Sequence, residues 1–411
     1  MIQALHRDAA AIIESSIAAV QPQDAVRRAL RQFKSGTGRT VLVSVGKAAW
    51  QMAEAAVSCL GRVDEGIVIT KDGHIRGQIP AVRCFEAGHP VPDDRSILAT
   101  EAAIGMVTEL TPEDTVLFLL SGGGSALFEK PLIPMAQLQD ITRQLLAKGA
   151  DITEINTIRK RLSAVKGGRF ARLCAPAAVF SIVLSDVLGD PLDMIASGPA
   201  YPDSTTCAQA RNIARKYGLR LSDDARARLE EETPKELSNV TTFVTGSVRQ
   251  LCAAAGAACE GLGYRPILLT DRLSCQAKEA GAFLAAIART HAGSGESLAF
   301  LAGGETVVHL TGTGKGGRNQ ELALAAAAGI EGLENVLVFS LGSDGTDGPT
   351  DAAGGIVDGT TADALRRQGL SIHQVLQNND AYHALAAVGG LIMTGPTGTN
   401  VNDVAVVLIR G

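Results

Sequence analysis

The sequence is poor in aromatic residues, at 4% of its 411 residues with a single tryptophan. No uninterrupted apolar run approaches the roughly 18 residues that a membrane-spanning helix needs. Basic residues (38) are slightly outnumbered by acidic ones (43), and the formal net charge is -5. Because binding to a phosphate backbone requires a basic excess, the composition argues against a nucleic-acid-binding protein as well as against a membrane protein.

Paired cysteine motifs are missing too. The seven cysteines include no C-x-x-C pair, and an odd number without that spacing is typical of reduced, mostly buried thiols. The N-terminal segment carries Arg7, Asp8 and Glu14, which interrupt any apolar run of the signal-peptide kind. We therefore expect a cytoplasmic protein.

Glycine, by contrast, is abundant, at 45 of 411 residues, and the length favours two domains. Short β-branched runs alternate with alanine-rich helical stretches, a pattern typical of βαβ units and a mostly parallel sheet. A charged, proline-containing stretch at 231–239 predicts a boundary between an N-terminal domain (1–232) and a smaller α/β C-terminal domain (238–411). Strands are expected at 40–45, 66–70, 82–86, 115–120 and 177–184, then at 241–245, 265–269, 297–302, 336–341 and 404–409.

Ligands of open α/β sheets bind beyond the carboxyl ends of the strands, so the loops that follow the strands are the places to search. The first such loop runs from a strand into a helix through Gly46 and Lys47. A lysine at a helix N-terminus is opposed by the helix dipole, which favours an anion beside it. A solvated lysine in an ordinary turn stays open as the alternative, and no Walker A pattern occurs anywhere in the chain.

The second loop, Ser121, Gly122, Gly123, Gly124 and Ser125, follows the apolar run TVLFLL. Three glycines permit backbone conformations closed to other residues, and successive N–H groups between two serines form a concave anion site. We predict that this loop binds phosphate or carboxylate, with a flexible turn as the alternative.

Two other motifs of the first half are weaker. His89 lies at a strand end, but a lone histidine is more often structural than functional. On a helix, Asn156, Lys160, Ser163 and Gly167 would share one face, a polar stripe that could line an anion-binding cleft. A solvated basic helix is the alternative favoured by these residues alone.

Carboxylates also gather after the strand at 177–184, where Asp186, Asp190 and Asp193 fall within eight residues. Such a group suits a divalent cation or the acceptance of a substrate proton. Asp190 precedes a proline and is explained by turn formation, so Asp186 is the candidate.

The second half of the chain has a glycine-rich loop with Lys315 and Arg318 before an alanine-leucine helix. This pair predicts an anion clamp, since arginine binds planar oxyanions through two hydrogen bonds. A later loop carries Asp344 and Asp351 at intervals that do not fit a calcium-binding loop. Tight turns remain the alternative for both loops.

Cationic, glycine-rich and acidic loops thus recur in both halves. Phosphoryl transfer requires these parts: positioning, neutralisation of the phosphate oxygens, magnesium between nucleotide phosphates and a group that receives the acceptor's proton. A cleft between two α/β domains would supply them.

The chain resembles the glycerate kinases of the MOFRL type, which have also been labelled hydroxypyruvate reductases of tartrate degradation. The resemblance spans nearly the whole chain in order, and no family motif is missing. It is carried by SVGKAAWQMAEAA, EAGHPVPDD, LLSGGGSALF, INTIRKRLSAVKGGRFA, LSDVLGDPLDMIASGP, GGETVVHLTGTGKGGRNQELALA, SLGSDGTDGPTDAAGGIVDG, NNDAYHAL and TGPTGTNVNDVAV.

The resemblance implies an ATP- and Mg²⁺-dependent glycerate 2-kinase that converts D-glycerate into 2-phosphoglycerate. It also implies a Rossmann-like N-terminal domain and a MOFRL-type C-terminal domain, with the active site in the cleft between them. By motif, Lys47 and Arg318 would act at the transferring phosphoryl group, Asp186 would be catalytic, and Asp344 and Asp351 would hold the metal. Nucleotide or substrate contacts would come from Gly46, His89, Ser121, Gly122, Gly123, Gly124, Ser125, Lys160, Glu305, Lys315 and Asn319. The expected partners are D-glycerate and ATP, and a homodimer stays open.

Two other functions, a reductase and a phosphosugar-binding module, are the alternatives. A reductase needs a nicotinamide site, and the nearest candidate is the strand, glycine and helix around Gly246, with Asp271 at the end of the next strand. The G-x-G-x-x-G fingerprint is missing there. A non-catalytic phosphosugar-binding module would use the Ser121–Ser125 loop, but it would need neither the Lys315–Arg318 pair nor the acidic loops.

Overall fold

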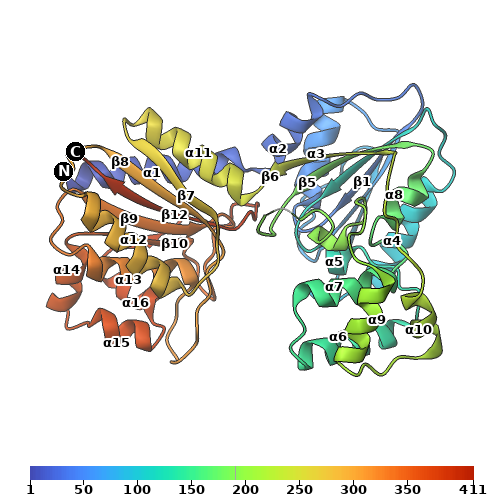
Figure 1. Cartoon of the computed structure of the whole chain (residues 1–411). Helices are drawn as coiled ribbons and strands as arrows, with labels where there is room; N and C mark the ends of the chain where they lie inside the picture. Colours follow the sequence, from blue (N-terminus) through green and yellow to red (C-terminus); the bar gives the residue numbers. More distant parts are fainter. Residues whose placement is uncertain (190) are drawn as a thin grey trace. The chain divides into compact units, whose positions relative to one another are not determined.

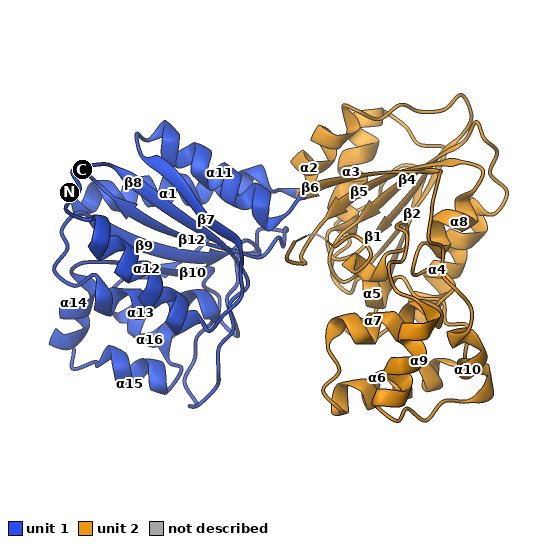
Figure 2. Cartoon of the chain, viewed as in Figure 1, with its two compact units in different colours: residues 1–21, 246–411 blue, residues 22–245 orange. Residues whose placement is uncertain are grey.

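The computed structural model describes residues 1–189 and 191–411, so the turn predicted at Asp190 lies outside the described residues. The chain forms two compact units, one made of Pro22–Thr245 and the other of Met1–Gln21 together with Gly246–Gly411 (Figure 2). Each unit contains a six-stranded sheet with helices packed on it, which confirms the predicted α/β class.

The sheet of the Pro22–Thr245 unit has the strand order β3-β2-β1-β4-β5-β6. Neighbouring strands from β3 to β5 all run parallel. This is the order of classic doubly wound sheets, in which the direction of winding reverses between β1 and β4. The strands are β1 (Thr40–Val45), β2 (Glu65–Lys71), β3 (Val82–Ala87), β4 (Thr115–Leu120), β5 (Ala178–Leu184) and β6 (Val240–Gly246).

Both faces of this sheet are covered, which explains why its inner strands β1, β4 and β5 are almost continuously apolar. In β1, Val41 and Val43 belong to one buried cluster, whereas Leu42 belongs to another on the opposite face. The first cluster includes side chains of α4 (Asp94–Val107) and α8 (Arg169–Cys174), and the second those of α2 (Pro22–Leu30) and α3 (Ala49–Leu60). For the inner strands the faces are therefore covered, and the loops beyond the strand ends remain for ligand binding.

The same unit has a separate helical layer (Figure 1). Buried side chains of this layer form an apolar core of their own. Its helices are α6 (Met135–Ala147), α7 (Ile152–Arg161), α9 (Cys207–Lys216) and α10 (Asp223–Leu229). One helical turn, α5 (Gly124–Leu127), and a 3₁₀ turn, η1 (Ile195–Ser197), lie on the loops after β4 and β5.

The second sheet has the order β11-β10-β9-β12-β8-β7 and mixed strand directions. β7 and β8 are parallel, whereas β12 is antiparallel to both of its neighbours, so its first residue lies beside the last residues of β8 and β9. The strands are β7 (Arg265–Leu273), β8 (Leu298–Gly304), β9 (Val336–Gly342), β10 (Gly354–Asp358), β11 (Leu391–Ile392) and β12 (Asp403–Ile409). The helices are α1 (Ile2–Ala19), α11 (Val248–Gly261), α12 (Ala277–His291), α13 (Arg318–Gly329), α14 (Thr361–Arg367), α15 (Ile372–Gln377) and α16 (Ala381–Ala387).

The division of the chain into units differs from the predicted one in two places, the boundary between the units and the N-terminal helix. The strand expected to open the C-terminal domain, β6, is instead the edge strand of the first sheet, so the boundary follows Thr245. Helix α1 belongs to the unit formed by the C-terminal half, where Asp8 accepts a hydrogen bond of 2.6 Å from the Tyr264 hydroxyl and His6 pairs with Asp358 at 2.9 Å. The predicted boundary rested on composition, which shows only where the chain is polar. The unit that a segment joins is decided by long-range pairings such as these.

The short strands β10 and β11 were not predicted. β10 begins with two glycines and β11 has two residues, so neither shows the β-branched alternation by which strands are recognised. Among the described residues, no helix combines the length and the apolar character needed to cross a membrane.

Candidate functional site

Two of the predicted loops meet at the point where the first sheet reverses its winding. β1 and β4 are neighbours, and Gly46–Lys47 follows the one while Ser121–Ser125 follows the other. A crevice for ligands is expected at this point of a doubly wound sheet. The topology therefore brings together two segments that are about 75 residues apart in the sequence.

The two loops are joined by hydrogen bonds. The backbone N–H of Lys47 donates to the Gly122 carbonyl (2.9 Å), and that of Ala48 donates to Ser121 Oγ (3.1 Å). Gly46 has a left-handed φ of +120°, and a Cβ at this position would lie 2.3 Å from Ser121 Oγ. The buried Ser121 hydroxyl thus holds the turn that presents Lys47, and its predicted contact with a ligand stays a prediction.

The three glycines make room for functional side chains. A Cβ on Gly122 would lie 2.2 Å from an Asp186 carboxylate oxygen, and one on Gly123 would lie 3.2 Å from both the His89 ring and the Lys47 side chain. Three of the predicted site residues, Lys47, His89 and Asp186, thus lie beside the glycine loop, and their functional roles stay a prediction.

The glycine loop also presents donors. Among the described residues, the backbone N–H groups of Gly122, Gly123 and Gly124 have no hydrogen-bond partner. Burial, together with the charge of Lys47, lowers the pKa of His89, so that its ring is neutral at pH 7. Free N–H groups beside a lysine and a neutral histidine are an arrangement that suits an anionic ligand.

Three residues behind this loop were not among the predicted site residues. The Ser125 carbonyl accepts hydrogen bonds from Arg159 (3.0 Å) and Lys166 (2.9 Å), and Lys166 lies 3.4 Å from the fully buried Glu129. Burial lowers the pKa of Lys166 to about 8, against the effect of Glu129. Arg159 and Lys166 belong to a basic segment of the sequence. Nothing in that segment shows which of its cations support the loop and which are solvated.

The polar stripe predicted around Asn156 and Lys160 differs from the expectation in two ways. Helix α7 ends at Arg161, so Ser163 and Gly167 lie beyond it rather than on its face. Asn156, Lys160 and Ser163 are buried, so the alternative of a solvated basic helix is wrong. Burial of these charges depends on partners from distant loops that local spacing does not reveal.

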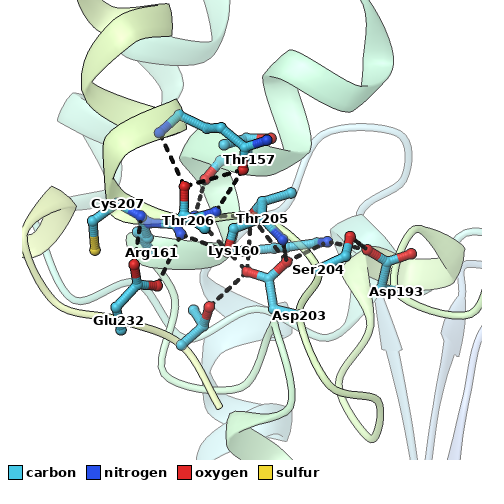
Figure 3. A network of polar contacts seen from close by, with 12 residues as sticks. Thr157, Lys160, Arg161, Asp193, Asp203, Ser204, Thr205, Thr206, Cys207 and Glu232 are labelled. Carbon is cyan, nitrogen blue, oxygen red and sulfur yellow. Dashed lines mark hydrogen bonds and ion pairs between the residues drawn. The ribbon is translucent and has the colours of Figure 1, made fainter. Parts of the chain in front are cut away.

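Lys160 lies in a buried ion-pair network (Figure 3). Its Nζ is 3.0 Å from Asp203 and 3.2 Å from Asp193, and the side chains of Lys160 and Asp203 are fully buried. Asp203 also accepts hydrogen bonds from the hydroxyls of Thr205 and Thr233. The network explains this lysine without a ligand, and its ligand contact stays a prediction.

Lys160→Ala should therefore destabilise the protein by about 3–5 kcal/mol, because it leaves the buried Asp203 without its closest cation. Thermal unfolding with and without the substitution measures this effect. The matched control is Lys216→Ala, which removes an exposed partner of Glu154 and should leave the melting temperature unchanged. An unchanged melting temperature with a raised KM in Lys160→Ala would instead indicate ligand binding.

In the unit that contains Gly246–Gly411, Arg318 joins the ends of two strands. Its Nε and Nη2 bind the two oxygens of Asp403 (2.5 and 3.0 Å), and its Nη1 binds Glu305 (2.9 Å). Burial raises the pKa of Asp403 to about 6, whereas pairing with Arg318 acts in the opposite direction. Arg318 does bind a planar oxyanion through two hydrogen bonds, but the oxyanion in the structure is a carboxylate of the protein itself.

The N-terminus of helix α13 is likewise occupied by a carboxylate of the chain. Asp347 accepts the backbone N–H groups of Asn319 (3.2 Å) and Gln320 (2.9 Å), and burial raises its pKa. The Asn319 side chain is also engaged, since it donates to Asp347 and accepts from Ser340. Asp347 and Asp403 were not predicted as site residues, because nothing in their local sequence marks them as partners of α13.

Lys315 and Asp351 both contact Tyr382. Lys315 Nζ lies 4.3 Å from the centre of the Tyr382 ring, and the Tyr382 hydroxyl donates to Asp351 at 2.8 Å. Lys315 and Arg318 thus have separate partners, and their joint action on an anion stays a prediction.

Asp344 follows β9 and forms a tight turn, accepting the backbone N–H of Thr346 at 2.9 Å. Gly345 in this turn has a left-handed φ of +83°, so turn formation explains part of the Asp-Gly pattern. No cluster of three or more potential metal ligands occurs in residues 1–189 and 191–411. Metal binding by Asp344 and Asp351 therefore stays a prediction.

The reductase alternative loses its structural basis. Strand β6, which ends at Gly246, belongs to the first sheet, and β7, which contains Asp271, belongs to the second. A dinucleotide-binding βαβ unit needs both strands in one sheet. Asp271 is instead 3.3 Å from Arg249.

Two family models match parts of the chain. A family model described as a domain of unknown function, DUF4147, matches residues 8–230, and the MOFRL family model matches residues 298–403. The chain is 50% identical to a D-glycerate 2-kinase of Thermotoga maritima over 99% of both chains. It is 40% identical to a glycerate 2-kinase of Pyrococcus horikoshii, over 90% of this chain and 88% of that protein.

A crystal structure of glycerate kinase from Thermotoga maritima superimposes with a TM-score of 0.95 and 49% identity, covering 99% of this chain and 100% of the other. Similarity of this extent spans both units. The chain therefore belongs to the glycerate kinase family, whose C-terminal part is the MOFRL domain.

Proposed function

We propose that this protein transfers the γ-phosphoryl group of ATP to the 2-hydroxyl of D-glycerate, giving 2-phosphoglycerate and ADP. The observation that carries the proposal is the 50% identity, over 99% of both chains, to a protein named D-glycerate 2-kinase. The free N–H groups beside Lys47 support it, because a phosphoryl donor and a hydroxy acid are both anions.

Within the Pro22–Thr245 unit, Lys47 and the N–H groups of Gly122–Gly124 would bind phosphate or carboxylate oxygens. Asp186, held against Gly122, would accept the proton of the 2-hydroxyl as the new P–O bond forms. His89 is neutral at pH 7 and would donate or accept a hydrogen bond without adding charge. Gly46 and Ser121 would act by shaping the turn that carries Lys47.

Within the unit that contains Gly246–Gly411, Arg318 would neutralise charge on the transferring phosphoryl group, with Glu305 and Asp403 fixing its orientation. Lys315 and Asn319 would contribute nearby contacts. Asp344 and Asp351 would be the ligands of Mg²⁺, because carboxylates supply hard oxygen atoms and this ion is commonly held by one or two carboxylates together with phosphate oxygens and water. When bound, Mg²⁺ would screen the negative charge of the phosphates.

The test is a coupled assay of the purified protein with ATP, Mg²⁺ and D-glycerate, in which enolase and pyruvate kinase detect only 2-phosphoglycerate. We expect a signal in the absence of phosphoglycerate mutase. A signal that appears only after phosphoglycerate mutase is added would indicate phosphorylation at the 3-hydroxyl instead. Oxidation of NADH or NADPH by hydroxypyruvate, with no kinase signal, would replace the proposal with the reductase alternative.

A further inference from the structure

The hydroxyl of Ser125 is the open end of a chain of hydrogen bonds in the Pro22–Thr245 unit. Ser125 Oγ lies 3.1 Å from Ser197 Oγ, which lies 3.0 Å from Asn156 Oδ1. The other side of the Asn156 amide faces Met194, with Nδ2 3.7 Å from Sδ. Asn156 and Ser197 are buried, whereas Ser125 is partly exposed.

The direction of these hydrogen bonds follows from counting hydrogens. A thioether sulfur can only accept, so Asn156 must present its N–H to Met194 and its oxygen to Ser197. The single hydroxyl hydrogen of Ser197 is donated to that oxygen. Ser197 can then only accept from Ser125, and the Ser125 hydrogen is directed into the protein.

The surrounding structure fixes the position of Ser125 as well as the direction of its hydroxyl hydrogen bond. Its carbonyl accepts hydrogen bonds from Arg159 and Lys166, and its hydroxyl faces a turn in which Ala196 and Ser197 have left-handed φ angles of +50° and +63°. Such conformations are rare for residues other than glycine and persist where the surroundings determine them. The exposed side of Ser125 Oγ therefore offers lone pairs and no hydrogen.

We propose that Ser125 recognises a hydroxyl group of a bound ligand by accepting its hydrogen, and that Asn156 and Ser197 are positioning residues that impose this polarity. Carboxylate and phosphate oxygens have no hydrogen to donate, so they are disfavoured at Ser125 Oγ. This inference rests on the proposed function, whose ligands carry two kinds of hydroxyl, those of D-glycerate and those of the ATP ribose.

The experiment compares ligand pairs by titration calorimetry on the full-length protein and on Ser125→Ala. D-glycerate is paired with D-lactate, which lacks the 3-hydroxyl, and with 3-hydroxypropionate, which lacks the 2-hydroxyl; ATP is paired with 2′-deoxy-ATP and 3′-deoxy-ATP. We expect the wild type to bind one of the deoxy ligands about threefold to tenfold more weakly than its parent, the range that one neutral hydrogen bond supplies. In Ser125→Ala that difference should disappear, and the pair in which it does so identifies the hydroxyl.

Ser197→Ala tests the positioning role, because it frees the Ser125 hydrogen to point outward. We expect the same loss of preference for the hydroxyl, with KM raised and kcat near the wild-type value. The matched control is Ser58→Ala, which removes an exposed hydroxyl that donates to Glu54. This variant should preserve the affinity ratio of every parent ligand to its deoxy analogue. Should Ser197→Ala fail to fold, the partly exposed Ser125→Ala still decides the question.

Unchanged ratios for all four pairs in Ser125→Ala would overturn this inference. If the coupled assay then still reports kinase activity in the wild type, the proposed function stands alone. If the wild type binds neither D-glycerate nor ATP, both proposals fall.

Discussion

Gly122→Ala is expected to reduce kcat about a hundredfold and to leave the melting temperature nearly unchanged. The added Cβ would lie 2.2 Å from an Asp186 carboxylate oxygen and 2.9 Å from the carbon that bears it, so the carboxylate must move. Displacement of a reacting group by about 1 Å can cost a factor of this size. Steady-state kinetics with D-glycerate and ATP, together with thermal unfolding, measure both effects.

The control for this substitution is Gly105→Ala. Gly105 lies inside helix α4, and a Cβ there would meet nothing within 4 Å. Alanine is favoured over glycine in a helix, so this variant should keep full activity and be as stable as the wild type or more so. Wild-type kcat in Gly122→Ala would show that the observed position of Asp186 is not required for turnover.

Arg318→Ala should lower kcat by at least about a hundredfold, the usual cost of removing a group that stabilises charge in a transition state. Arg318→Lys should recover only part of the activity, because lysine cannot reproduce the two parallel hydrogen bonds to Asp403. Kinetics of the three proteins at pH 8 measure the effect.

The loss of stability caused by Arg318→Ala should depend on pH. In Arg318→Ala, Asp403 is buried without its counter-charge, so its folded-state pKa should rise above the present value of about 6. A carboxyl whose pKa is raised on folding stabilises the protein below its unfolded-state pKa, and this contribution is lost as the pH rises through the folded-state pKa. We therefore expect a larger loss of melting temperature at pH 8 than at pH 5, and equal losses would argue against the Asp403 pairing.

Much of the fold could be predicted because local patterns specify it. All ten predicted strands are present within a few residues, since β-branched runs bounded by glycine and polar residues have few alternatives. The approach of Lys47, His89 and Asp186 to the glycine loop also followed from the rule that strand ends of a parallel sheet share an edge. The family resemblance gave the expected chemistry of the loops.

The sequence by itself determined the α/β class, the strands, the glycine-rich loop and membership of the glycerate kinase family. The tertiary structure alone decided that β6 joins the first sheet, that α1 joins the unit formed by Gly246–Gly411 and that Lys160 is neutralised by Asp203. It also decided that Asp403 and Asp347 hold the start of α13. The physical reason is that strand formation and turns depend on neighbours in the chain, whereas burial of a charge depends on partners dozens of residues away.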